Sequence, residues 1–408
     1  MMPQREVWVP VPNLDIAEGW KQRLILSQNN TPKSILANAI TALRHAPQWA
    51  AVLAFNEFTS TINVQKPAPW GGAGDRTWSD VDDIRTAEWL QHQGILVGTQ
   101  NAAQAVQTVA EDRRFHPVRE YLASVEWDQT ERIPSWLSLY LGVVPSNYAV
   151  EAGRRWLIQA VARVHKPGCK ADNCIILEGR QGLKKSTSLN YLAEPWFTDE
   201  LGDLGSKDAS MQTAGVWVIE LAELESLSRP EAGRIKAFMS RATDRFRPPY
   251  GHRVISAPRQ SVFAGTVNGD SYLKDETGGR RFWPISCGEI AIADLRRDRD
   301  QLWAEAKAAF DAGAPWWFDT RELEQAAEEE QGSRFDDDPW SNTINTWVEG
   351  RDSVTIDQIL GACIEKPRGQ WNQQDKNRVA RCLRCAKWKR YRQRIPGDGV
   401  EWRYRRGE

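Results

Sequence analysis

Three apolar runs in the middle of the chain are each followed by a stretch with helical periodicity. The runs lie at 174–177, 215–219 and 261–265, and their lack of polar alternation is typical of buried strands. After them, apolar residues recur at the spacing of one helix face over 186–192, 230–239 and 294–312. This order predicts an α/β domain.

Shorter patterned segments lie on both sides of this domain. Before it, we expect helices at 34–43, 80–91, 135–141 and 148–164, and strands near 51–58 and 94–99. After it, we expect helices at 340–348, 356–363 and 374–386, and two strands within 389–405. The chain therefore contains more than one domain.

The first apolar run leads into a glycine-containing turn. Gly179 and Gly182 let the backbone curl so that successive amide N–H groups can point at phosphates. Lys185 and Ser186 then occupy the phosphate-lysine and magnesium-hydroxyl positions of a P-loop, although Lys184 stands where the motif has its second glycine. An ordinary glycine turn before a basic helix is the alternative. The residues expected to bind ATP are Gly179, Arg180, Gln181, Gly182, Leu183, Lys184, Lys185, Ser186 and Thr187.

Polar residues end the second and third apolar runs. An ATPase needs an acid that holds Mg²⁺ and aligns the attacking water, and Glu220 is in that position, with Glu223 as its partner or substitute. We expect Ser186 and Glu220 to hold the metal. Asn268 ends the third run, where it is suited to sense the γ-phosphate or to position water. A core strand followed by solvated acids is the alternative.

Two adjacent arginines follow a glycine pair farther along the chain. Arg280 and Arg281 lie on a jointed segment, as is needed for an arginine that reaches the nucleotide of a neighbouring subunit. Plain surface charge is the alternative. The expected catalytic residues are therefore Lys185, Glu220, Glu223, Asn268, Arg280 and Arg281.

Two basic regions suit a nucleic-acid backbone. The first is a hairpin or loop between the second and third runs, and the second is the tail 351–408, with 15 lysines and arginines against 7 aspartates and glutamates. Three helices and a basic two-stranded wing in the tail resemble a winged-helix domain, whose third helix enters the major groove. A solvated hairpin and a winged helix used for protein contact are the alternatives. The residues expected to contact DNA are Arg245, Arg247, Tyr250, His252, Arg253, Arg378, Arg381, Arg384, Lys387 and Lys389.

The order of these segments resembles the virulence-associated protein E family, phage and mobile-element ATPases similar to superfamily 3 helicases of the AAA+ class. The resemblance extends from about residue 115 to 317. Besides the P-loop and the two strand ends, it rests on Phe115-His-Pro-Val-Arg-Glu-Tyr-Leu, Glu126-Trp-Asp, Trp196-Phe-Thr-Asp, Leu204-Gly-Ser-Lys-Asp, Arg245-Phe-Arg-Pro-Pro-Tyr-Gly and Thr277-Gly-Gly-Arg-Arg-Phe-Trp-Pro. It implies a homo-oligomeric ATPase, hexameric or otherwise ring-forming, that moves on single-stranded or forked DNA with ATP and Mg²⁺ as cofactors.

Bulk properties narrow the class further. A length of 408 residues suits two or three domains, and six cysteines do not form a disulfide framework at this size. No apolar run of about 18 residues and no apolar core of a signal peptide occur, so we expect a cytoplasmic protein without a membrane partner. Residues 1–112 lack a cluster of metal-binding acids, so a primase partner would be a separate chain.

We therefore expect an α/β protein in five parts, with a P-loop AAA+-like core as the third. They are an N-terminal α/β accessory domain (1–112), a helical collar (113–170), the ATPase core (171–320), an acidic linker (321–339) and a C-terminal winged-helix domain (340–408). The expected function is an ATP-dependent DNA helicase or translocase that acts in replication of a phage, prophage or plasmid. A non-motor ATPase that loads other replication proteins, and a DNA-binding regulator with a degenerate P-loop, are the alternatives.

Overall fold

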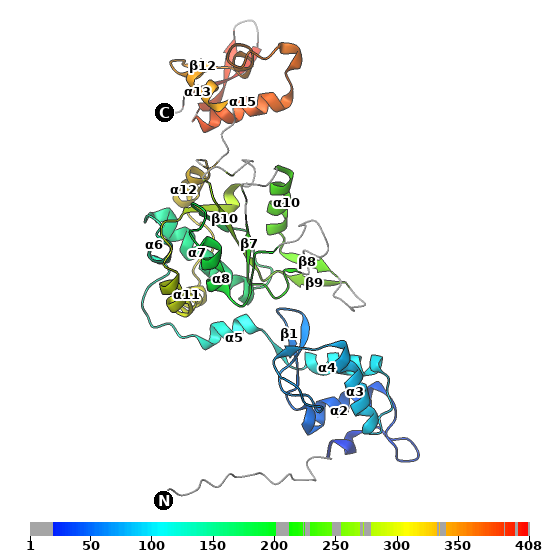
Figure 1. The fold of residues 1–408 in the computed structure, drawn as a ribbon. Coiled ribbons are helices and arrows are strands. Elements are labelled where there is room, and N and C mark those ends of the chain that lie inside the picture. The colour runs from blue at the N-terminus through cyan, green and yellow to red at the C-terminus, as the bar shows by residue number, and fades with distance from the viewer. Residues whose placement is uncertain are drawn as a thin grey trace, which may run out of the picture.

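Five parallel strands form the central sheet of the protein, in the order β11-β5-β10-β7-β6. The computed structural model describes residues 19–200, 212–222, 224, 229–246, 254–269, 272, 279–332, 334, 340–386, 388–395 and 399–406. The strands are β5 (Cys174–Glu178), β6 (Phe197–Thr198), β7 (Val218–Leu221), β10 (Val262–Val267) and β11 (Phe282–Ser286). Figure 1 shows this sheet in the middle part of the chain, with helices around it.

Helices cover both faces of this sheet. Alternate strand residues point to opposite sides, and in these strands the residues on both sides are apolar. Ile175 and Leu177 belong to the larger apolar cluster. That cluster is shared with α7 (Asn147–His165), α8 (Lys185–Ala193) and α11 (Ile292–Asp311). The intervening residues Cys174 and Ile176 pack on the other side, with α10 (Arg229–Met239). The apolar runs are continuous because both faces are buried.

Two short helices precede α7 in the same apolar cluster. They are α5 (Pro117–Ser124) and α6 (Trp136–Leu141). The predicted helices at 135–141 and 148–164 are thus confirmed, as are the strand at 174–177 and the helices at 186–192, 230–239 and 294–312. The structure does not test whether residues 113–170 act as a collar between subunits.

The N-terminal part has its own four-stranded sheet and its own apolar core. The strands β1 (Leu53–Asn56), β2 (Thr61–Val64), β3 (Arg76–Thr77) and β4 (Arg114–Phe115) are ordered β3-β2-β1-β4. The helices are η1 (Gly19–Arg23), α2 (Leu36–His45), η2 (Pro47–Trp49), α3 (Asp80–His92) and α4 (Thr99–Glu111). The α/β character predicted for this part is present, and Figure 1 shows the part as a unit apart from the central sheet.

The strand predicted at 94–99 is wrong. Ile95 and Val97 are buried and Leu96 is 69% exposed, so the alternation is real. No strand among the described residues pairs with this segment, and a helix, α4, begins at Thr99. The alternating pattern therefore belongs to a connection between α3 and α4 whose Ile95 and Val97 are buried in the core.

The sequence predicts a solvated helix end and an acidic linker at 321–339, and this is wrong for 321–332, where the helix is packed into the core. Residues Arg321–Gly332 form helix α12, and its Leu323 and Ala327 are buried in the main apolar cluster. Gln331 is buried and donates from Nε2 to the backbone oxygen of Phe282, 2.8 Å away. The acidic residues lie on the outer side of a helix that packs beside β11.

The C-terminal part is a helical unit with a small antiparallel sheet and its own apolar cluster. Its helices are α13 (Ser341–Val348), α14 (Ile356–Gln358), the π-helical turn η5 (Ile359–Cys363), η6 (Arg368–Gln370) and α15 (Gln373–Cys385). The strands β12 (Ser353–Val354), β13 (Trp388–Ile395) and β14 (Gly399–Arg406) are ordered β12-β14-β13. The three predicted helical segments and the predicted pair of strands are present. None of the described helices is long and apolar enough to cross a membrane.

Candidate nucleotide-binding site

The predicted P-loop connects β5 to α8 as a tight turn. Gly179 has a φ of +144°, and a Cβ placed on it would lie 2.7 Å from Cδ1 of Leu183. Gly182 has a φ of +86° in open space. Both glycines are therefore needed, the first for backbone shape and close approach and the second for backbone shape alone.

Lys184 adopts the left-handed conformation directly before α8, with φ 65° and ψ 30°. A residue with a Cβ is disfavoured there by roughly 1–2 kcal/mol relative to the right-handed region. The residue at the position of the motif's second glycine thus adopts a conformation that favours glycine. The strain remains in the loop.

Lys185 is buried and holds the loop in its curled form. Its Nζ donates to the backbone oxygens of Gly179 and Arg180, at 2.6 and 3.1 Å. It also donates to Oδ1 of Asn268, 3.2 Å away at the end of β10. The ammonium group thus connects the P-loop with the predicted sensor residue.

Ser186 and Glu220, the predicted metal pair, are in direct contact. The Ser186 hydroxyl donates to Oε1 of Glu220 at 2.7 Å, and the Thr266 hydroxyl donates to the same oxygen at 2.6 Å. Glu220 is 1% exposed, and its Oε2 has no hydrogen-bond partner among the described residues. An unpartnered buried carboxylate oxygen is costly. A divalent cation beside it would remove that cost, so these residues fit Mg²⁺, which prefers carboxylate and hydroxyl oxygens.

Parallel strands explain why these residues meet. Glu220 lies beside Ala264 in the pairing of β7 with β10, so the carboxyl ends of the two strands share one edge of the sheet. The P-loop follows β5 at the same edge. The structure therefore brings together Lys185, Ser186, Glu220 and Asn268, together with Thr266.

Sequence reasoning missed an ion-paired cluster beneath the P-loop. Glu178, the last residue of β5, accepts from Nε and Nη2 of Arg334 at 2.9 and 3.0 Å. It also accepts from the hydroxyls of Tyr272 and Ser286, at 2.9 and 2.7 Å. Burial first, and then the Glu178 carboxylate, raise the pKa of Tyr272 far above its ordinary value, so this hydroxyl stays protonated. A charged residue at the end of an apolar strand was the one available signal.

Arg280 and Arg281 lie at the opposite edge of the sheet from the P-loop of the same chain. They form η4 (Gly279–Arg281) just before β11, and Phe282 pairs with Cys174 at the start of β5. Four residue steps of about 3.3 Å place them about 13 Å along the strand from the loop. They are therefore far from their own P-loop.

The two arginines differ in their surroundings. Nε of Arg281 is 3.0 Å from Oδ2 of Asp172 in a partly buried ion pair. Arg280 is exposed, at the rim of an open pocket of about 640 Å³ that also contains Trp317, which is 48% exposed. Arg280 is the better placed of the two to meet another molecule.

The predicted basic hairpin is present, but its tip is not described. Strands β8 (Thr243–Phe246) and β9 (Ile255–Pro258) pair antiparallel, and Arg245 is exposed on β8. In the C-terminal part, the guanidinium of Arg378 lies 3.9 Å from the ring centre of Trp340, and Lys389 is exposed on β13. The following predicted residues, or their side chains, lie outside the described part of the chain: Glu223, Arg247, Tyr250, His252, Arg253, Arg381, Arg384 and Lys387.

The N-terminal part contacts the core at the amino ends of β7 and β10. The backbone N–H of Gly215 donates to the oxygen of Phe58 at 2.9 Å, and Nε2 of Gln260 donates to the oxygen of Glu57 at 3.3 Å. Phe58 is buried in the main apolar cluster of the core. The strands that carry Glu220 and Asn268 at one end therefore touch the N-terminal part at the other.

His116 belongs to this contact. Its Nδ1 accepts from the backbone N–H of Arg119 at 3.2 Å, so the neutral ring carries its proton on Nε2, which donates to Oε1 of Gln260 at 2.6 Å. Burial lowers the pKa of His116, and the hydrogen bond to Gln260 opposes that shift. Nδ1 can accept from Arg119 only in the neutral ring, whereas Nε2 can donate to Gln260 in either form.

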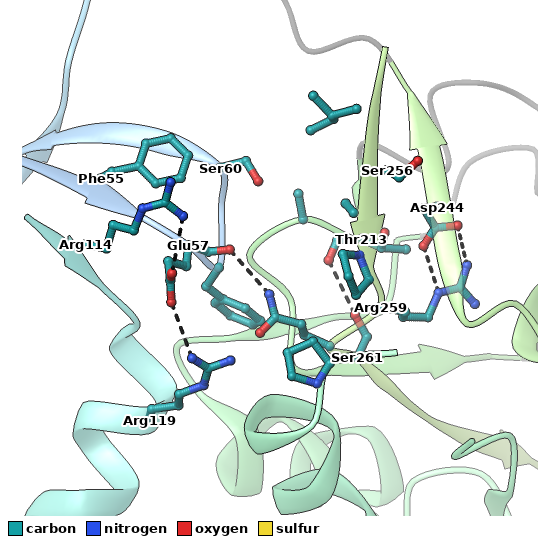
Figure 2. Close-up of a pocket in the computed structure, with 17 residues that line it drawn as sticks. Phe55, Glu57, Ser60, Arg114, Arg119, Thr213, Asp244, Ser256, Arg259 and Ser261 are labelled. Atoms are coloured by element: carbon teal, nitrogen blue, oxygen red, sulfur yellow. Dashed lines mark hydrogen bonds and ion pairs between the residues drawn. The ribbon is translucent and has the colours of Figure 1, made fainter. Parts of the chain in front are cut away.

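A pocket of about 330 Å³ opens beside the same contact. Figure 2 shows Glu57 between Arg114 and Arg119, with Phe55 and Ser60 on the same side. The Nη1 atoms of Arg114 and Arg119 lie 3.7 and 3.3 Å from the Glu57 carboxylate. The carboxylate thus offsets much of the positive charge, and Arg119 of α5 joins the core to the N-terminal part.

Comparison with known proteins identifies the family. The model of the virulence-associated protein E-like domain matches residues 122–335, which include the P-loop, Glu220, Asn268 and Arg280. The chain belongs to this family. The resemblance found in the sequence is thus confirmed. No curated protein matches the chain.

Solved structures of one protein resemble the chain at low identity. The apo structure of the NrS-1 C-terminal region is 12% identical, with a TM-score of 0.46, and the match covers 86% of this chain and 95% of that one. The A form of the same region is also 12% identical, with a TM-score of 0.46, and covers 87% and 96%.

Proposed function

We propose that this member of the virulence-associated protein E-like family is an ATP-dependent DNA helicase or translocase. We propose that it acts in the replication of a phage, prophage or plasmid. The observation that carries the proposal is the contact of Ser186 with Glu220, beside the contact of Lys185 with Asn268, at the carboxyl edge of a parallel sheet. Ligands of open α/β sheets bind at this edge.

Each residue of the site has a role in the proposal. The backbone N–H groups of the loop 179–184 and the N-terminus of α8 would bind the phosphates. Lys185 would exchange its contacts with loop carbonyls for phosphate oxygens. Ser186 and Glu220 would hold Mg²⁺, which neutralises developing charge on the phosphates. Glu220 and Asn268 would orient the attacking water.

The proposed nucleotide site is shared between two copies of the chain. Arg280 is exposed and about 13 Å from its own P-loop along β5, so it would serve a neighbour's nucleotide and not its own. Arg281, which pairs with Asp172, would fix the position of this segment. A closed ring supplies every subunit with a neighbour, and we propose a hexamer.

DNA binding is proposed for the basic parts of the chain. The β8–β9 hairpin carries Arg245, and the helices and the β13–β14 strands of the C-terminal part are arranged in the order of a winged-helix domain. Contact between the N-terminal part and β7 and β10 would transmit changes at the nucleotide to residues 19–112. A primase would act as a separate chain.

DNA-stimulated ATP hydrolysis tests this proposal. The intact chain should release phosphate from ATP in a Mg²⁺-dependent reaction that DNA accelerates, and Lys185→Ala should reduce the rate to background. Equal background rates for both proteins would contradict the ATPase function.

Two alternatives are separated by further assays. A non-motor ATPase that loads other replication proteins would hydrolyse ATP but would not displace a strand from forked DNA. A DNA-binding regulator with a degenerate P-loop would bind DNA without hydrolysis, and the left-handed Lys184 is the observation that favours it.

A further inference from the structure

Strands β13 and β14 form a strongly basic two-stranded ribbon at the end of the chain. Against one acid, Glu401, the ribbon carries Lys389, Arg390, Arg392, Arg394, Arg403, Arg405 and Arg406. This density is typical of a surface that faces a polyanion.

One face of the ribbon packs on the C-terminal core at one end and is exposed at the other. Residues of this face alternate along each strand, and its Trp388 and Tyr404 are buried in the C-terminal cluster. Farther from the core, the same face carries Trp402, which is 41% exposed and lies opposite Arg392. An exposed tryptophan among cations is not needed for the core.

Trp402 holds two guanidinium groups of the neighbouring strand. The Cζ atoms of Arg390 and Arg392 lie 3.9 and 4.5 Å from its ring centre. Stacking on a ring uses the face of a guanidinium group and leaves its N–H donors at the edge available. Among the described residues, no carboxylate pairs with Arg390, Arg392 or Arg394. The positions of Arg390 and Arg392 are therefore fixed while their donors remain open to a ligand.

We propose that this face of the ribbon binds the phosphate backbone of duplex DNA through Arg390 and Arg392, which Trp402 holds in position. The inference rests on the proposed DNA-dependent function, and it assigns DNA contact to residues outside the set predicted from the sequence. The guanidinium groups already cover the ring of Trp402, which disfavours base stacking. Duplex DNA has the higher charge density, with one charge per about 1.7 Å of axis.

The salt dependence of duplex binding by the full chain tests the proposal. Fluorescence anisotropy with a labelled duplex would measure affinity between about 50 and 200 mM salt. The slope of log K against log salt is negative, and the double variant Arg390→Ala/Arg392→Ala should reduce its magnitude by about 1.8, at about 0.9 per lost phosphate contact. The same relation gives a loss in affinity of roughly 60-fold at about 0.1 M salt.

Two further variants separate position from charge. Trp402→Ala keeps both cations, so the slope should not change, but affinity should fall about tenfold because two side chains must be ordered on binding. Trp402→Phe should restore most of the affinity. The matched control is Arg403→Ala/Arg405→Ala, which removes two cations from the opposite face and should leave the slope nearly unchanged.

The outcomes distinguish this inference from the proposed function. An unchanged slope for Arg390→Ala/Arg392→Ala, or an equal loss for Arg403→Ala/Arg405→Ala, would overturn the assignment to this face. ATP hydrolysis without DNA should be the same in all ribbon variants. Duplex binding with the expected losses, but without ATP hydrolysis by the unmodified chain, would overturn the proposed function and support the ribbon.

Discussion

Replacing Glu220 with glutamine removes its charge with little change in shape. Both hydroxyl donors, from Ser186 and Thr266, point to Oε1, so the amide oxygen of glutamine can accept both. The amide nitrogen then takes the place of Oε2, which has no partner among the described residues. An unpartnered charged oxygen is at least as costly to bury as an unpartnered amide. We therefore expect no decrease in the free energy of unfolding.

Hydrolysis should respond very differently from stability. A positioned general base contributes about 10²- to 10⁴-fold, which corresponds to about 3–5 kcal/mol of activation free energy. We expect Glu220→Gln to lower kcat for ATP by this factor while the protein still binds ATP. Phosphate release and binding of a fluorescent ATP analogue would measure the two effects separately.

The control is Thr266→Val, which removes one donor to Glu220 and keeps the carboxylate. Its kcat should fall much less than that of Glu220→Gln. Normal hydrolysis by Glu220→Gln would refute the assignment of metal and water to this residue and would transfer the role to Glu223.

Three further predictions concern other parts of the chain. Arg280→Ala should lower ATP hydrolysis roughly 10³-fold with unchanged ATP affinity. Mixing Arg280→Ala with Lys185→Ala protein should restore part of the activity, because some sites then combine an intact P-loop with an intact arginine. No recovery would contradict a shared site. The free energy of unfolding, measured by denaturant titration, should be roughly 1 kcal/mol higher for Lys184→Gly than for Lys184→Ala. Both variants lose the ammonium group, and only glycine relieves the left-handed strain. Equal stabilities would contradict the strain. Burial lowers the pKa of His116 below 6.5, so the stability that the neutral ring gives where the N-terminal part meets the core is complete above pH 6.5 and decreases as the pH falls below it. Protonation removes the Nδ1 acceptor and places a charge in a buried site. Hydrogen exchange at Gly215 should rise accordingly in the unmodified protein but not in His116→Asn, and a pH-independent exchange rate would contradict this role.

Local sequence patterns were sufficient to predict that Lys185, Ser186, Glu220 and Asn268 lie close together. The strands that end in Glu220 and Asn268 can be predicted because each apolar run and the polar residue that ends it are adjacent in sequence. A parallel sheet then places their ends at one edge. The contact of Thr266 with Glu220 needs the strand register, which the sequence does not contain.

Contacts between distant segments could not be predicted in the same way. Glu178 and Arg334 are separated by 156 positions, and nothing local pairs them. Helix α12 was taken for a linker because its acids dominate the composition, while only a few small and medium residues such as Leu323 and Ala327 are buried. The contact of His116 with Gln260 likewise depends on how two separate parts of the chain pack.

Direct titration with ATP is the most decisive test of the nucleotide site. The intact chain should bind a fluorescent ATP analogue saturably, and more tightly with Mg²⁺ than without it. Lys185→Ala should weaken binding roughly 10- to 100-fold, because hydrogen bonds to charged groups contribute about 1.5–3 kcal/mol. Absence of binding with and without Mg²⁺, or equal affinity in the variant, would contradict the account.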